Sequence, residues 1–205
     1  MIFYTADLHF GSEEQAEKRK NHFASVDEMD ERLVDNWNAA VSPDDTVYLI
    51  GDLTDHSLPL PEMCLSRLSG HKYLIRGNHD AGMEQQERLY DYFESVSDYY
   101  EITDSGYNIT LCHYPLVYLH SGYMIHGHIH RPVGTAFGLL QKLPKVLNAG
   151  VDLNDYRPAT LAELLQNNTK YYGDREQTKP TPASGQREQH RKWKAEFRPI
   201  PPKTE

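Results

Sequence analysis

Short polar clusters rich in Asp, Asn and His recur along the sequence between positions 7 and 130. Carboxylate, amide and imidazole groups in combination suit Mn, Fe, Zn, Ni or Co rather than the soft ligand sets that select copper. The clusters supply seven candidate metal ligands, which are Asp7, His9, Asp52, Asn78, His113, His128 and His130. Two such ions roughly 3.5–4 Å apart clamp a phosphate and generate hydroxide near neutral pH, so these residues predict hydrolysis of phosphate esters.

No cluster is specific by itself. Asp7-Leu-His9 and Gly51-Asp52 would each fit an ordinary turn, and His113 alone is more often a buried structural histidine than a ligand. Gly77-Asn-His-Asp80 and Gly127-His-Ile-His130 are more specific, because a generic turn does not require their histidines. It is the complete set, in this order, that indicates one metal site.

Each cluster directly follows a segment that is predicted to be a β-strand. In layered α/β folds ligands bind where loops leave the strand ends, because rigid strands direct these loops into one crevice. A capping box at Ser25-Val-Asp-Glu28, with apolar residues at helical spacing behind it, predicts a helix that ends near Pro43. The predicted strands are 2–6, 46–50, 72–75, 99–103, 107–112, 123–126 and 146–149, and further helices are predicted over 61–68, 84–93 and 159–165.

The order of these elements predicts the fold class and the domain organisation. Strands and helices alternate in the first half and strands dominate the second, which favours α/β layers over a helical bundle or an all-β barrel. Residues 173–205 are rich in Pro, Gln and charged residues and poor in core-forming ones. We therefore expect one domain over 1–172, followed by a tail that is disordered or loosely docked.

Charge and composition narrow the range of partners. The chain has 21 basic and 30 acidic residues. Residues 173–205 contain eight of the basic and five of the acidic ones, which leaves 13 basic and 25 acidic residues in 1–172. Such an acidic body argues against a broad nucleic-acid-binding face. No apolar run approaches the roughly 18–20 residues of a membrane span, and no signal peptide is apparent. Cys64 and Cys112 are the only cysteines, which fits a reducing cytoplasm better than a disulfide scaffold.

The motifs DLH, GD, GNHD, H and GHIH, in that order, resemble the calcineurin-like metallophosphoesterases over about residues 1–170. The segments MIFYTADLHFG and NAGVDLNDYRPATL are similar to a small bacterial or phage branch of that family, although Ser12 stands where members of this branch often carry histidine. The resemblance implies a four-layer α/β/β/α sandwich with two mixed β-sheets. It also implies two divalent metal ions, of which Mn²⁺ is the first candidate.

The resemblance assigns a function to each motif residue. It gives the first metal to Asp7, His9, Asp52 and His130, and the second metal to Asp52, Asn78, His113 and His128, so that Asp52 bridges the two ions. It implies that His79 contacts the phosphate and protonates the leaving oxygen, while Asp80 orients His79. Arg76 precedes the GNHD motif and is expected to touch the phosphate, as a planar guanidinium can.

The expected function is therefore metal-dependent hydrolysis of a phosphodiester or phosphomonoester by a metal-bound hydroxide, with small diester or nucleotide substrates favoured. Two alternatives remain, a non-catalytic protein-interaction scaffold on the same fold and a nuclease that holds its polymer with the basic tail. The complete ligand set and the presence of His79 argue against a scaffold. The acidic body argues against a nuclease. The sequence leaves the natural substrate, the native metal and the oligomeric state open.

Overall fold

Two four-stranded sheets form the centre of the protein in a computed structural model that describes residues 1–55, 61–81, 88, 91–117, 119 and 122–173. The first sheet has the order β1-β2-β3-β4 and the second the order β5-β6-β7-β8. Their strands are β1 (Ile2–Thr5), β2 (Thr46–Ile50), β3 (His71–Ile75), β4 (Ser95–Ser97), β5 (Tyr100–Asp104), β6 (Tyr107–Leu111), β7 (Tyr123–His126) and β8 (Val146–Asn148).

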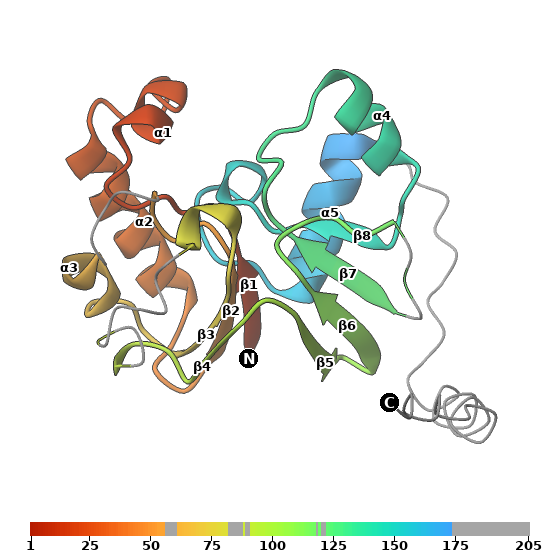
Figure 1. Ribbon diagram of the computed structural model, residues 1–205, viewed down its shortest axis with the longest axis horizontal. Helices are drawn as coiled ribbons and strands as arrows, with labels where there is room; N and C mark the ends of the chain where they lie inside the picture. Colours follow the sequence, from red (N-terminus) through yellow and green to blue (C-terminus); the bar gives the residue numbers. More distant parts are fainter. Residues whose placement is uncertain (56–60, 82–87, 89–90, 118, 120–121, 174–205) are drawn as a thin grey trace, which may run out of the picture.

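Helices cover the outer face of each sheet. In Figure 1, α1, α2 and α3 lie on the outer side of the first sheet, and α4 and α5 lie beyond the second. This arrangement confirms the expected α/β/β/α sandwich. The helices are α1 (Glu13–Lys18), α2 (Val26–Ala40), α3 (Glu62–Leu65), α4 (Gly134–Gln141) and α5 (Leu161–Tyr172), with 3₁₀ turns η1 (Asn78–Asp80) and η4 (Val151–Leu153). No helix in the described ranges is long and apolar enough to cross a membrane.

The two sheets differ in strand direction, and here the expectation of two mixed sheets needs correction. All neighbouring strands in the first sheet are parallel, and parallel neighbours require crossover connections. The connection from β1 to β2 contains α2, and the connection from β2 to β3 contains α3. The second sheet is mixed, with β5 and β6 antiparallel and the remaining pairs parallel. Ser105 and Gly106 form the turn between β5 and β6, and their φ values of 51° and 81° suit a tight hairpin.

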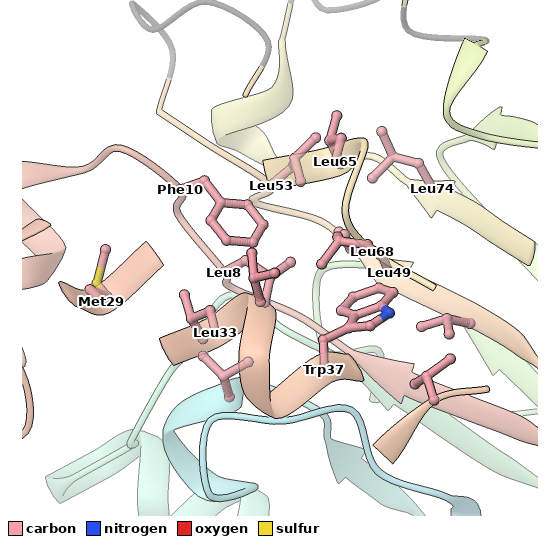
Figure 2. Packing of buried hydrophobic residues seen from close by; sticks show 14 of the residues in the cluster. Leu8, Phe10, Met29, Leu33, Trp37, Leu49, Leu53, Leu65, Leu68 and Leu74 are labelled. Atoms are coloured by element: carbon pink, nitrogen blue, oxygen red, sulfur yellow. The ribbon is translucent and has the colours of Figure 1, made fainter. Parts of the chain in front are cut away.

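Side-chain alternation along the strands separates the core into layers. Val47 and Leu49 of β2 pack with α2 in one buried cluster, whereas Tyr48 and Ile50 face the second sheet in another. Figure 2 shows Trp37 of α2 among the side chains of the first cluster. This period of two is what places a hydrophobic layer on both faces of the first sheet.

The sequence located the strands that carry the motifs better than it located the helices. The strands predicted over 46–50 and 123–126 are confirmed at both ends, and the strand predicted over 2–6 is confirmed within one residue. The last helix is longer than predicted and begins after Thr160, which forms a capping box with Glu163. Most of the helix predicted over 84–93, and the tail from 174 onward, lie outside the described residues.

Candidate metal centre

The loops that leave β1, β2, β3, β6 and β7 meet at one edge, where the two sheets adjoin. The Asp7 N–H donates to the Gly51 carbonyl at 3.0 Å, which joins two loops of the first sheet. Across the sheets, the His128 N–H donates to Asp7 Oδ1 at 2.8 Å, and His113 Nδ1 lies 2.9 Å from the Ile50 carbonyl. All seven candidate ligands are thereby brought together, in two groups.

The first group consists of Asp7, His9 and His130, whose ligand atoms all lie within 4.8 Å of one another. Among the buried side chains of the described residues, Asp7 Oδ2 and His9 Nε2 have no hydrogen-bond partner. A buried polar atom left unpaired costs about 1–3 kcal/mol, and a bound cation would remove that cost. Burial raises the pKa of Asp7 to about 6 and lowers the pKa of His9 to about 4. The His9 imidazole is therefore neutral at pH 7, as a metal ligand must be.

The second group consists of Asp52, His113 and His128, again within 4.8 Å of one another, together with Asn78. Asn78 Oδ1 lies 3.1 Å from His113 Nε2 and 2.8 Å from His128 Nδ1. One carboxylate, one amide oxygen and two imidazoles form a donor set suited to a divalent first-row ion.

Asp52 lies between the two groups. Its Oδ2 is 3.6 Å from His9 Nε2 and 3.3 Å from His113 Nε2. Burial alone would raise the Asp52 pKa, but the hydrogen bond and charge of His113 outweigh it and bring the pKa down to about 2. Asp52 Oδ1 instead accepts the His79 N–H at 2.9 Å. One oxygen of Asp52 therefore faces both groups.

The Nδ1 atoms of three candidate histidines contact oxygens that fix the ring. His9 Nδ1 lies 2.8 Å from Asp55 Oδ1 and His130 Nδ1 lies 3.0 Å from Asp152 Oδ2, in the same way that His113 contacts a backbone carbonyl. Metal-binding histidines characteristically donate one ring N–H to a carboxylate or carbonyl, which leaves the other nitrogen for the ion. The surroundings of these imidazoles thus fit bound divalent cations.

Five candidate ligands have a left-handed backbone conformation that residues other than glycine rarely adopt. The φ values are 59° at Asp7, 54° at His9, 57° at Asp52, 69° at His128 and 44° at His130. Each such conformation costs roughly 1–3 kcal/mol and persists only where the surrounding structure enforces it. The loops are held in this strained form by the hydrogen bonds between them, and the strain coincides with the candidate ligands.

Gly77 provides the close approach that Asp52 requires. A Cβ atom at Gly77 would stand 2.3 Å from Asp52 Oδ1 and 2.6 Å from the Asp52 nitrogen. The φ of Gly77 is −98°, so alanine suits the backbone and the conflict is purely steric.

Gly77→Ala is therefore expected to lower Mn²⁺ affinity about 10–100-fold, the range typical of residues that support a ligand. The expected loss of unfolding free energy is about 1–3 kcal/mol from overpacking. Gly138→Ala in α4 is the control, because no heavy atom lies within 4 Å of its added Cβ and alanine favours a helix. Metal titration and thermal unfolding measure both effects, and unchanged Mn²⁺ affinity in Gly77→Ala would contradict the steric argument.

Asp55 is a residue of the site that the sequence reasoning missed. Its Oδ1 lies 2.8 Å from His9 Nδ1 and 3.1 Å from His79 Nδ1, so one carboxylate joins a candidate ligand to the candidate acid. The Ser12 hydroxyl also hydrogen-bonds to Asp55. The signal was present in the sequence, since Asp55 follows Asp52 by three positions in the same loop.

Asp80 and Arg76 make contacts other than those that the resemblance implies. The buried Asp80 carboxylate accepts hydrogen bonds from the backbone N–H groups of Asp52, Leu53 and Gly77 at 2.8–2.9 Å. Its contacts thus fix the loop that carries Asp52, and the carboxylate beside the His79 ring is Asp55. The Arg76 guanidinium forms a two-bond pair with Asp98, so Arg76 has no part in the mechanism proposed below.

Arg19 connects α1 to the first group of ligands. Its buried guanidinium donates to the Asp7 carbonyl at 2.8 Å and the Leu8 carbonyl at 3.1 Å, and pairs with both oxygens of Asp152. Burial acts to raise the Asp152 pKa, but hydrogen bonds from His130 and Arg19 hold it below its usual range. Nothing in the sequence indicated this role for Arg19, because α1 was not predicted.

The chain is similar to several known proteins. A family model described as calcineurin-like phosphoesterase matches residues 1–173. An uncharacterised protein of Methanocaldococcus jannaschii is 28% identical over 170 residues, which are 80% of this chain and 89% of that protein. The gene 66 protein of Mycobacterium phage L5 is 38% identical over 81 residues, 38% of this chain and 39% of that protein. The crystal structure of a protein of unknown function from Aquifex aeolicus superposes with a TM-score of 0.64 at 26% identity, covering 81% of this chain and 98% of that one.

Proposed function

Because the chain belongs to the calcineurin-like phosphoesterase family, we propose that it hydrolyses small phosphodiesters or nucleotides at a centre of two divalent ions, with Mn²⁺ the first candidate. The observation that carries this proposal is the position of Asp52 Oδ2, 3.6 Å from a nitrogen of one donor group and 3.3 Å from a nitrogen of the other. An oxygen so placed is suited to a shared ligand.

Two groups of residues would hold the ions. Asp7, His9 and His130 would bind one, Asn78, His113 and His128 the other, and Asp52 both. When bound, such a pair of ions supplies positive charge to the phosphate oxygens and activates a water as the nucleophile. Arg19 and Asp80 position the ligand loops from behind, through backbone carbonyls and backbone N–H groups respectively.

His79 is the proposed proton donor. Its Nδ1 lies 3.1 Å from the Asp55 carboxylate, and this contact fixes the orientation of the ring. The proton on the other nitrogen is then available to the oxygen that leaves phosphorus. The His79 ring also lies 5.0 Å from the His9 ring, so the proton donor stands beside the ion-binding groups.

The proposal predicts metal-dependent turnover of simple esters. We expect the protein to be inactive after a chelator has removed its metal ions. Addition of Mn²⁺ should then restore hydrolysis of bis(p-nitrophenyl) phosphate as the ions bind. Hydrolysis of p-nitrophenyl phosphate, measured in parallel, compares monoester with diester activity. Mass spectrometry of the metal content counts the ions. Less than one ion per chain at saturating Mn²⁺, without activity on either ester, would refute the proposal.

A further inference from the structure

Tyr114 is an exposed aromatic residue in direct contact with the second ligand group. Its ring centroid lies 4.8 Å from that of His128 and 5.3 Å from that of His113, both in edge-to-face geometry. Although it follows a completely buried histidine, Tyr114 is 46% exposed. Tyr99 is similarly exposed, but its hydroxyl donates to Glu101 of β5, and its ring does not pack on the ring of a candidate ligand. Its contacts with His113 and His128, together with its exposure, therefore distinguish Tyr114 from the other tyrosines that the structure describes.

Further exposed apolar residues lie in the loops that leave the site. Val117 is 81% exposed in the loop that follows His113, and Val133 is 77% exposed in the loop that follows His130. Tyr114 belongs to the first of these loops. The surroundings of Asp55 and His79, by contrast, are charged and polar. Tyr114 and Val117 thus give the loop that follows His113 of the second ligand group exposed apolar surface, whereas the proton donor contacts His9 of the first group.

The position of the proton donor determines which part of a substrate would reach Tyr114. The leaving oxygen must lie near His79, whose ring contacts His9 of the first group. Tyr114 contacts His113 and His128 of the second group. In an in-line displacement the attacking water and the leaving oxygen lie on opposite sides of phosphorus, and the retained groups point sideways. An organic group next to Tyr114 is therefore one that stays on phosphorus, and a phosphomonoester has no such group.

We propose that Tyr114 is a specificity-determining residue that stacks on an aromatic group retained on phosphorus, so that the substrates are diesters whose retained alcohol is a nucleoside or carries an aryl ring. This inference rests on the proposed function and deepens it. Stacking of a base on an aromatic side chain is sequence-tolerant, because every base has a flat face. Its usual strength corresponds to a change of about 5–150-fold in affinity.

Three esters with the same leaving group test the proposal. They are the p-nitrophenyl ester of thymidine 5′-phosphate, methyl p-nitrophenyl phosphate and p-nitrophenyl phosphate. In each, water adds to phosphorus, the bond to p-nitrophenol breaks and the leaving oxygen takes up a proton. The retained group is thymidine, methyl or none. We expect the Mn²⁺-loaded protein to have a lower KM for the thymidine ester than for the methyl ester.

Tyr114→Leu is expected to reduce this preference for the thymidine ester about tenfold or more, mainly through KM, whereas Tyr114→Phe should retain it. Tyr99→Leu is the matched control and should leave the preference unchanged. An equal loss on all three esters, with a lower metal content, would show that Tyr114 merely supports His128 and would overturn the proposal.

Binding of thymidine 5′-monophosphate, measured by calorimetry against inorganic phosphate, tests the stacking without turnover. We expect the nucleotide to bind more tightly than phosphate, and Tyr114→Leu to remove the difference. Equal binding of the two by the wild-type protein would overturn the Tyr114 proposal even if the esters are hydrolysed. Tight nucleotide binding without hydrolysis of any ester would instead refute the proposed function.

Discussion

Asp52→Asn is expected to lower kcat by on the order of 10³-fold or more and to reduce the bound Mn²⁺ from two ions per chain to one or none. Asp52 Oδ2 faces both donor groups, and an amide nitrogen in that place could not bind either ion. The fold should survive, because asparagine keeps an oxygen that can accept the His79 N–H. Steady-state kinetics and metal analysis measure the two losses.

A control for Asp52→Asn needs a carboxylate at the other end of the sheets. Asp104→Asn serves, because Asp104 pairs with Tyr107 at the start of β6, while the metal centre lies beyond the end of that strand. Asp104 accepts the Tyr4 hydroxyl at 2.8 Å, so Asp104→Asn removes a carboxylate charge without changing a candidate ligand. If Asp52→Asn kept two ions and more than a tenth of the activity, Asp52 would not be the shared ligand.

His79→Gln is expected to lower kcat by about 10²–10⁴-fold while both ions remain bound. The distinction follows from the structure, since it is the backbone N–H of His79 that fixes Asp52, and this group survives the substitution. The loss should grow with the pKa of the leaving alcohol, because a poor leaving group depends most on proton donation. A series of aryl and alkyl esters measures this dependence.

His71→Gln is the control for loss of an imidazole. His71 begins β3, at the far end of the strand from the centre, and pairs with the exposed Glu94. We expect neither turnover nor metal content to change in that variant. If His79→Gln lost an ion and slowed every ester equally, His79 would be a metal ligand with Asp55 and His9, the third group of donors that the structure brings together.

The sequence predicted that the candidate ligands would lie close together, because each follows a strand with clear apolar character. Thr46–Ile50 has a helix-facing and a sheet-facing set of side chains, so its bounds, and the place of Asp52 beyond them, could be located from pattern alone. Position in a loop after a strand was enough to predict that Asp7 and His128 would meet, although 121 positions separate them.

The supporting residues could not be predicted in the same way, because their contacts depend on how distant segments pack. Arg19 and Asp152 are 133 positions apart, and although Asp152 lies in the segment NAGVDLNDYRPATL, nothing in the sequence pairs it with Arg19. Asp80 does belong to a motif, yet its carboxylate accepts hydrogen bonds from the backbone N–H groups of Asp52 and Gly77, and a linear pattern cannot show such contacts. The pair of Arg76 with Asp98 could not be predicted either, because Asp98 lies just beyond the end of β4, a strand that the sequence did not indicate.

The left-handed backbone at the candidate ligands sets thermal stability against the retention of the ligand side chains. Glycine adopts such a conformation without steric cost, so a glycine at any of these five positions would relax the loop while deleting a donor. Selection for thermal resilience alone would favour that exchange, in keeping with the general trade-off between stability and a strained active site. If variants of this protein were selected only for survival of heating, we would expect glycine substitutions at these five positions to appear early.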